Sequence, residues 1–146
     1  MRLSTRTRYG VRLMLALAVN YGKGILLLKD IAEKEKISEK YLGQIIIPLR
    51  TGGLVNSVRG AKGGYSLARP PAEITVKEIT EILEGDICLT DCLKDITSCD
   101  RITECATRKV WERLTAAVSD VLGSITLAAL AEDARRLSST SYHYQI

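Results

Sequence analysis

Residues 38–70, SEKYLGQIIIPLRTGGLVNSVRGAKGGYSLARP, contain the pattern that decides the fold. The first part predicts a helix over residues 39–49 with Ser38 as its cap, because a serine hydroxyl can accept from the free N–H groups of a first helical turn. Apolar residues recur at i, i+3, i+4 and i+7, which indicates one buried stripe. The stripe comprises Leu42, Ile45, Ile46 and Leu49.

Two short β-prone runs follow this helix and enclose a basic tip that reads RGAKGG. The pattern predicts a β-hairpin, since glycines permit the backbone angles of a tight turn. A nucleotide-binding loop is a poorer interpretation, because the tip lacks the Gly-Lys-Ser/Thr ending and the following helix of a Walker motif.

A short predicted helix over residues 29–34 precedes the capped helix, and the pair resembles a helix-turn-helix. In that motif the second helix enters the major groove of DNA. The hairpin then acts as a wing whose tip follows the phosphate backbone or enters the minor groove. A first helix is predicted over residues 4–21, and arginines crowd its beginning. These arginines are either simply exposed to solvent or contact DNA phosphates. The expected DNA-binding residues are Arg2, Tyr9, Ser38, Lys40, Tyr41, Gln44, Arg59 and Lys62.

The chain divides into four predicted parts, and its fold class is mainly α. Residues 1–85 form a winged helix-turn-helix DNA-binding domain with a two-stranded wing, whose last helix begins at a capping box of Thr75 and Glu78. Residues 86–108 form a cysteine-bearing, cluster-binding loop, and residues 109–137 a long C-terminal dimerisation helix with a short following helix. Residues 138–146 form a polar tail that is expected to be poorly ordered.

The long predicted helix carries an apolar stripe that a domain of some 85 residues cannot cover completely. The simplest partner is the same helix of a second copy in a two-fold homodimer, and packing onto its own domain is the alternative. The stripe comprises Val110, Leu114, Ala117, Val118, Val121 and Ile125.

Composition and cysteine content narrow the function class. A net charge of +4 permits a nucleic-acid partner, and the apolar run at residues 13–19 is too short to span a membrane. We therefore expect a cytoplasmic protein with reduced thiols, in which four cysteines favour a metal or redox site over disulfides. Their C-x3-C-x6-C-x5-C spacing lacks the paired CxxC of a zinc ribbon, so cluster binding, zinc binding and inert or redox thiols all stay open. No nucleophile–base pair is visible, which argues against an enzyme.

Several motifs resemble those of the IscR, NsrR and CymR group of bacterial winged-helix transcription regulators. They are RLSTRTRYGVRLMLALA, LRTGGLVNSVRGAKGGY, ILEG, VWERL and SITLAAL, and together they extend over nearly the whole chain. The resemblance implies a homodimer that binds double-stranded DNA at a palindromic operator. IscR-like members bind a [2Fe-2S] cluster through three cysteines and a histidine, and NsrR-like members can hold a [4Fe-4S] cluster and sense nitric oxide. CymR-like members carry no cluster and act with a partner enzyme of cysteine metabolism.

Carried onto this chain by position, the three cluster cysteines of the IscR type match Cys92, Cys99 and Cys105. The resemblance thus implies a sensor with a 2Fe-2S cluster, or a 4Fe-4S cluster, that controls iron–sulfur cluster biogenesis genes. The alternatives are a CymR-like regulator of cysteine metabolism and an NsrR-like nitric oxide sensor. Arg108 occupies the place of the histidine ligand and cannot bind iron, because its guanidinium stays protonated. The candidates for a fourth ligand are Cys88, Asp91, Asp95, Asp100, Glu104 and His143.

Overall fold

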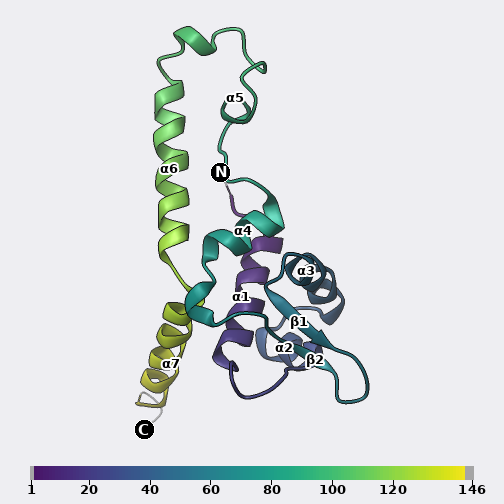
Figure 1. Cartoon of the computed structure of the whole chain (residues 1–146). Coiled ribbons are helices and arrows are strands. Elements are labelled where there is room, and N and C mark those ends of the chain that lie inside the picture. The colour runs from purple at the N-terminus through teal and green to yellow at the C-terminus, as the bar shows by residue number, and fades with distance from the viewer. Residues whose placement is uncertain (1, 144–146) are drawn as a thin grey trace.

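The chain folds into a winged helix-turn-helix body from which one long helix projects (Figure 1). The structure is a computed structural model that describes residues 2–143, with side chains for residues 2–140. The elements of the body are α1 (Thr5–Val19), α2 (Leu28–Glu35), α3 (Glu39–Thr51), β1 (Val55–Val58), β2 (Gly64–Leu67), η1 (Pro71–Glu73) and α4 (Val76–Glu84). The remaining elements are α5 (Asp91–Lys94), η2 (Ile102–Glu104), α6 (Arg108–Ser124) and α7 (Leu127–His143).

Local hydrogen bonds begin the helices where the sequence predicted them. The Ser38 hydroxyl accepts from the Tyr41 N–H at 3.0 Å and caps α3, and Ser4 caps α1 in the same way. Thr75 and Glu78 form the predicted capping box of α4. The predicted stripe of α3 is entirely buried, and the helix continues past Pro48 to Thr51.

The predicted wing is an antiparallel pair in which Val55 lies opposite Leu67 and Val58 opposite Gly64. A bridge attaches the pair to the body, because the Leu26 N–H donates to the Tyr65 carbonyl at 2.9 Å and the Tyr65 N–H donates to the Leu26 carbonyl at 2.8 Å. This close approach requires glycine at position 64, where an added Cβ would lie 2.6 Å from the Leu26 carbonyl oxygen.

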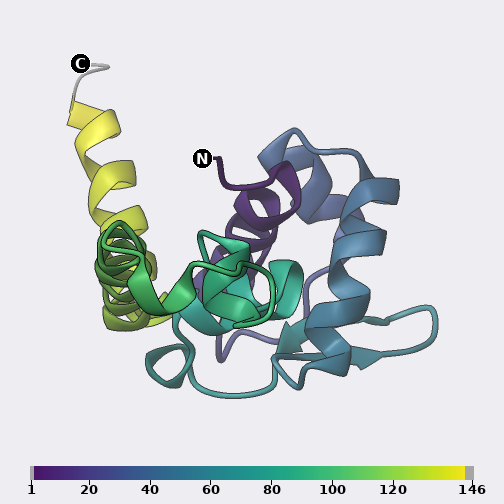
Figure 2. The ribbon, with the colours of Figure 1, turned by 90° about the horizontal axis from the view of Figure 1, so that it is seen from above.

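Helix α7 completes the core of the body, which the sequence analysis had placed entirely before residue 86. Leu127 and Ala131 are buried with the residues of α1, and backbone bonds join Val76 to Ile125 and Leu127 to Ile74. Seen from above, α6 and α7 stand along one side of the body (Figure 2). Helix α7 runs to His143. The prediction that this helix ends at Leu137 and is followed by a poorly ordered tail was therefore wrong for residues 138–143.

Helix α6 buries none of its residues, and its predicted stripe is divided between two faces. Val118 is half-buried towards the body, where it lines a cavity with Leu122 and Leu3. Leu114 and Val121 remain 42% and 57% exposed. Ile125 lies just beyond the end of α6, which corrects its predicted place in the helix. Among the described residues, no helix has the length and apolar character needed to cross a membrane.

Candidate DNA-binding surface and cysteine segment

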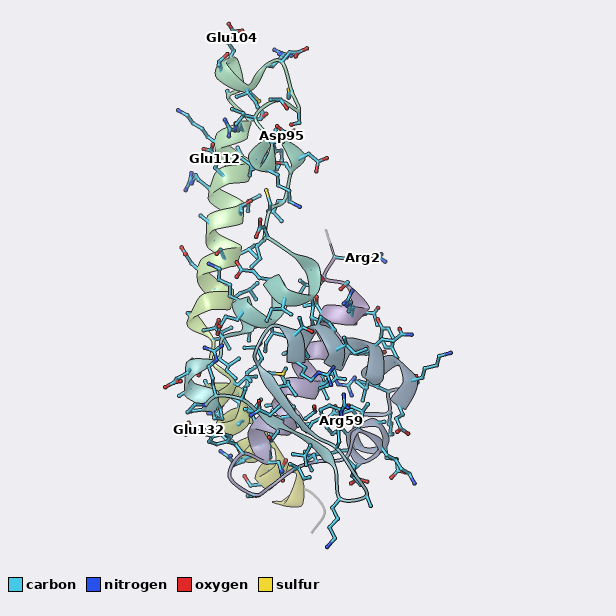
Figure 3. The ribbon with its side chains drawn as sticks, turned by 45° about the vertical axis from the view of Figure 1, so that its right-hand side comes forward. Arg2, Arg59, Asp95, Glu104, Glu112 and Glu132 are labelled. Atoms are coloured by element: carbon cyan, nitrogen blue, oxygen red, sulfur yellow. The ribbon has the colours of Figure 1, made fainter. Side chains whose placement is uncertain are left out.

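The N-terminal half of α3 presents polar side chains next to the wing. Lys40 and Gln44 are exposed on the side opposite the buried stripe, since a period of 3.6 residues separates the two faces. At the wing tip, Arg59 and Lys62 are both exposed, and Arg59 is labelled on the wing in Figure 3. The predicted helix and wing residues Lys40, Gln44, Arg59 and Lys62 are therefore all accessible to solvent.

A groove separates the wing from the beginnings of α2 and α3, and two further cations line it. Lys29 and Arg50 share this groove with Arg59 and Tyr65. Arg50 also donates from Nη1 to Ser57 Oγ at 3.5 Å, which ties the end of α3 to β1. Neither Lys29 nor Arg50 was predicted from the sequence, although the position of Arg50 in the last helical turn before the wing was an available signal.

Tyr9 and Tyr41 connect α1 to α3 rather than extending freely into solvent. Their rings meet edge to face with centroids 5.9 Å apart, and both side chains are half-buried. The guanidinium of Arg12 lies 5.6 Å from the centre of the Tyr9 ring and pairs with Glu35 at 2.8 Å. Arg2 is exposed and lies apart from this cluster, at the end of the body that faces the cysteine segment (Figure 3).

The cysteine segment, residues 85–107, extends beside the upper half of α6 and away from the wing (Figure 1). It carries the short helices α5 and η2, and Asp95 and Glu104 lie towards its far end (Figure 3). The four thiols are free, with Cys99 exposed and Cys88, Cys92 and Cys105 half-buried.

Threonine residues hold three of the four thiols. Cys88 Sγ donates to the Thr90 carbonyl at 3.2 Å, and Cys92 Sγ lies 3.3 Å from Thr90 Oγ1. Cys105 Sγ lies 3.3 Å from Thr107 Oγ1. Hydrogen bonding from Thr107 and from the Arg108 backbone lowers the pKa of the Cys105 thiol.

The three proposed cluster cysteines do not form a metal site in this conformation. Within the described side chains, no three Cys, His, Asp or Glu residues are gathered closely enough to hold a metal ion. A [2Fe-2S] or [4Fe-4S] cluster needs thiolates that converge on it. The residues present therefore do not fit a cluster as they are arranged here.

The candidates for a fourth ligand are dispersed. Cys88 lines the cavity beside Arg2, and Asp95 accepts from the backbone and the hydroxyl of Thr97, which lower its pKa. Asp91, Asp100 and Glu104 are exposed. His143 ends α7 at the opposite end of the molecule, and its side chain lies outside the described ones. Arg108, in the place of the histidine ligand, pairs with Glu112 at 3.4 Å.

Comparisons with known proteins agree with this architecture. A model of the Rrf2 family, described as iron-dependent transcriptional regulators, matches residues 3–133. The regulator CymR of Bacillus subtilis is 44% identical over 131 residues, which cover 90% of this chain and 90% of CymR. A solved structure of CymR, described as the global cysteine regulator of B. subtilis, covers 90% of this chain and 97% of its own, with a TM-score of 0.78 and 41% identity. A solved structure of T. potens IscR covers 92% and 88%, with a TM-score of 0.76 and 42% identity.

These matches confirm the resemblance, the fold class and the prediction of a regulator instead of an enzyme. The family match spans the wing, the cysteine segment, α6 and the first seven residues of α7. The chain belongs to the Rrf2 family of transcriptional regulators.

Proposed function

We propose that the protein is a cytoplasmic, homodimeric regulator that binds a palindromic operator through α3 and the wing. The observation that carries this proposal is the exposure of Lys40 and Gln44 on α3 and of Arg59 and Lys62 at the wing tip of one winged helix-turn-helix body. Polar side chains at the start of α3 suit base edges, and cations at the wing tip suit phosphate or the minor groove. Lys29 and Arg50 line the groove beside Arg59, together with the carboxylate of Glu39, so cations outnumber acids there.

The other residues predicted to bind DNA position α3 or add positive charge in this proposal. Ser38 sets the start of α3 through its cap, and Tyr9 sets the angle between α1 and α3 through Tyr41. Arg2 supplies a further cation from the N-terminus. Two-fold symmetry through α6 would place two such surfaces on two half-sites of one operator.

In vitro selection from random duplexes, followed by fluorescence anisotropy at fixed salt, tests DNA binding. Arg59→Ala should weaken binding to the selected operator, whereas Arg135→Ala removes the same charge from the exposed surface of α7 and should not. Failure to select any sequence, or equal affinities for all three proteins, would refute the proposal.

For the signal, we propose iron–sulfur sensing through Cys92, Cys99 and Cys105. It is supported by the position of these cysteines and by the similarity to IscR. Because the thiols are not gathered in this conformation, the proposal requires the cysteine segment to close around a cluster. Its target would be iron–sulfur cluster biogenesis genes. An NsrR-like response to nitric oxide is a variant of the same idea.

A cluster-free, CymR-like regulator of cysteine metabolism that acts through a protein partner is the second candidate. It is supported by the 44% identity to CymR and by the separation of the thiols among the described residues. In this case the cysteines would hold no metal, and regulation would depend on a protein surface.

Iron and acid-labile sulfide analysis of anaerobically prepared protein separates the two candidates. The cluster proposal predicts bound iron and sulfide, which are lost when Cys92, Cys99 and Cys105 are all replaced by Ala, together with a change in DNA affinity or operator choice. Metal-free wild-type protein, with unchanged DNA binding in the triple variant, would reject the cluster and favour the second candidate.

A further inference from the structure

A backbone-to-side-chain hydrogen bond joins the N-terminus of the chain to the end of α4. The backbone N–H of Ser4 donates to Glu84 Oε1 at 2.9 Å, across 80 positions of sequence. Glu84 is the last residue of α4, and Gly85 follows it with a φ of 87°. The chain therefore turns sharply just after this carboxylate and enters the cysteine segment.

The partner of Glu84 is itself held firmly. Ser4 caps α1 by accepting from the Thr7 N–H at 3.0 Å, and its hydroxyl also lies 3.3 Å from Thr7 Oγ1. Thr7 is only 2% exposed, so the cap is anchored in the core. Hydrogen bonding from Ser4 and Thr7 lowers the pKa of Glu84, because these donors stabilise the ionised carboxylate.

One cavity connects this bond to both the N-terminal arm, residues 2–4, and the cysteine segment. Its lining includes Arg2 and Leu3 of the arm, Glu84 at the end of α4, and Cys88 and Leu89 of the cysteine segment. A displacement of residues 85–89 would therefore act on the bond that holds Ser4, two residues from Arg2.

We propose that Glu84 is a positioning residue for DNA binding, whose carboxylate fixes the N-terminal arm against the start of the cysteine segment and so orients Arg2 towards DNA. The inference rests on the proposed function, in which Arg2 is one of the DNA contacts. Glu84 contacts no DNA itself in this scheme; it acts through Ser4 and Arg2.

Anisotropy with the selected operator tests the inference in the full-length protein. Glu84→Ala removes the acceptor and should weaken binding about three- to tenfold, the range expected for one lost hydrogen bond. Glu84→Gln keeps an oxygen acceptor and should bind like wild type. Glu84→Asp keeps the charge but shortens the side chain, so it should behave like Glu84→Ala and serves if that variant is unstable. Glu81→Ala, one turn earlier on α4, is the matched control.

Combination with Arg2→Ala separates positioning from general stability. If Glu84 acts through Arg2, Glu84→Ala should cause no further loss in an Arg2→Ala background. Losses that multiply in the double variant, or wild-type affinity in both Glu84→Ala and Glu84→Asp, would overturn the proposal. If Arg59→Ala weakens binding, the proposed DNA-binding function stands whether or not Glu84 has a positioning role. If the wild-type protein does not bind DNA, both the proposed function and the role of Glu84 are refuted.

Discussion

The exposed stripe of α6 predicts that Leu114→Asp weakens a dimer of this protein. Leu114 is 42% exposed in a single chain, and burial of a whole leucine side chain is worth about 2 kcal/mol. Covering the exposed part in a two-fold interface then contributes about 0.8 kcal/mol per copy and about 1.7 kcal/mol for both. Its loss alone corresponds to about a 15-fold higher dimer dissociation constant. Two buried carboxylates would add to this effect, so the value is a lower bound.

Sedimentation equilibrium over a wide concentration range measures this dissociation constant directly. Ala116→Asp introduces the same carboxylate on an exposed, neighbouring position of α6 that lies outside the stripe, and it should leave the dimer intact. A wild-type protein that stays monomeric at high concentration would refute the reasoning. An unchanged dissociation constant in Leu114→Asp would refute it equally, because the interface would then lie elsewhere.

Three further predictions concern the wing, α3 and the cysteine segment. Arg59→Ala should cost about 1–3 kcal/mol of DNA-binding free energy if Arg59 makes a base contact, as anisotropy at constant salt would show. Gly43→Ala should raise the free energy of unfolding by up to about 1 kcal/mol in urea titrations, because its Cβ would meet only Leu28 Cδ2, at 3.8 Å. A lowered pKa makes the Cys105 thiolate available at lower pH, so Thr107→Val should shift the pH profile of Cys105 alkylation, followed by mass spectrometry, to higher pH.

The cysteine segment illustrates where prediction from sequence ends. The spacing of Cys92, Cys99 and Cys105 marks them as a set, and their similarity in position to the IscR type suggests a shared ligand. In the structure they occupy separate turns, and each half-buried thiol of the set interacts with a nearby threonine. Convergence on one cluster depends on how a long loop closes, and sequence spacing does not determine that closure.

Elements whose signals are local could be predicted from the amino-acid sequence. The cap at Ser38, the capping box at Thr75 and the buried stripe of α3 all depend on residues within one or two helical turns of each other. The wing likewise follows from a glycine-rich tip between two short β-prone runs.

Which distant elements pack together became known only from the folded structure. It places α7 in the core, turns Val118 towards the body while Leu114 stays exposed, and joins Ser4 to Glu84. These outcomes depend on packing between segments far apart in sequence, because a helical stripe specifies that a face is buried but not which partner buries it. Lys29 and Arg50 were not predicted from the sequence for the same reason, because they line a groove with Arg59 only in the folded protein.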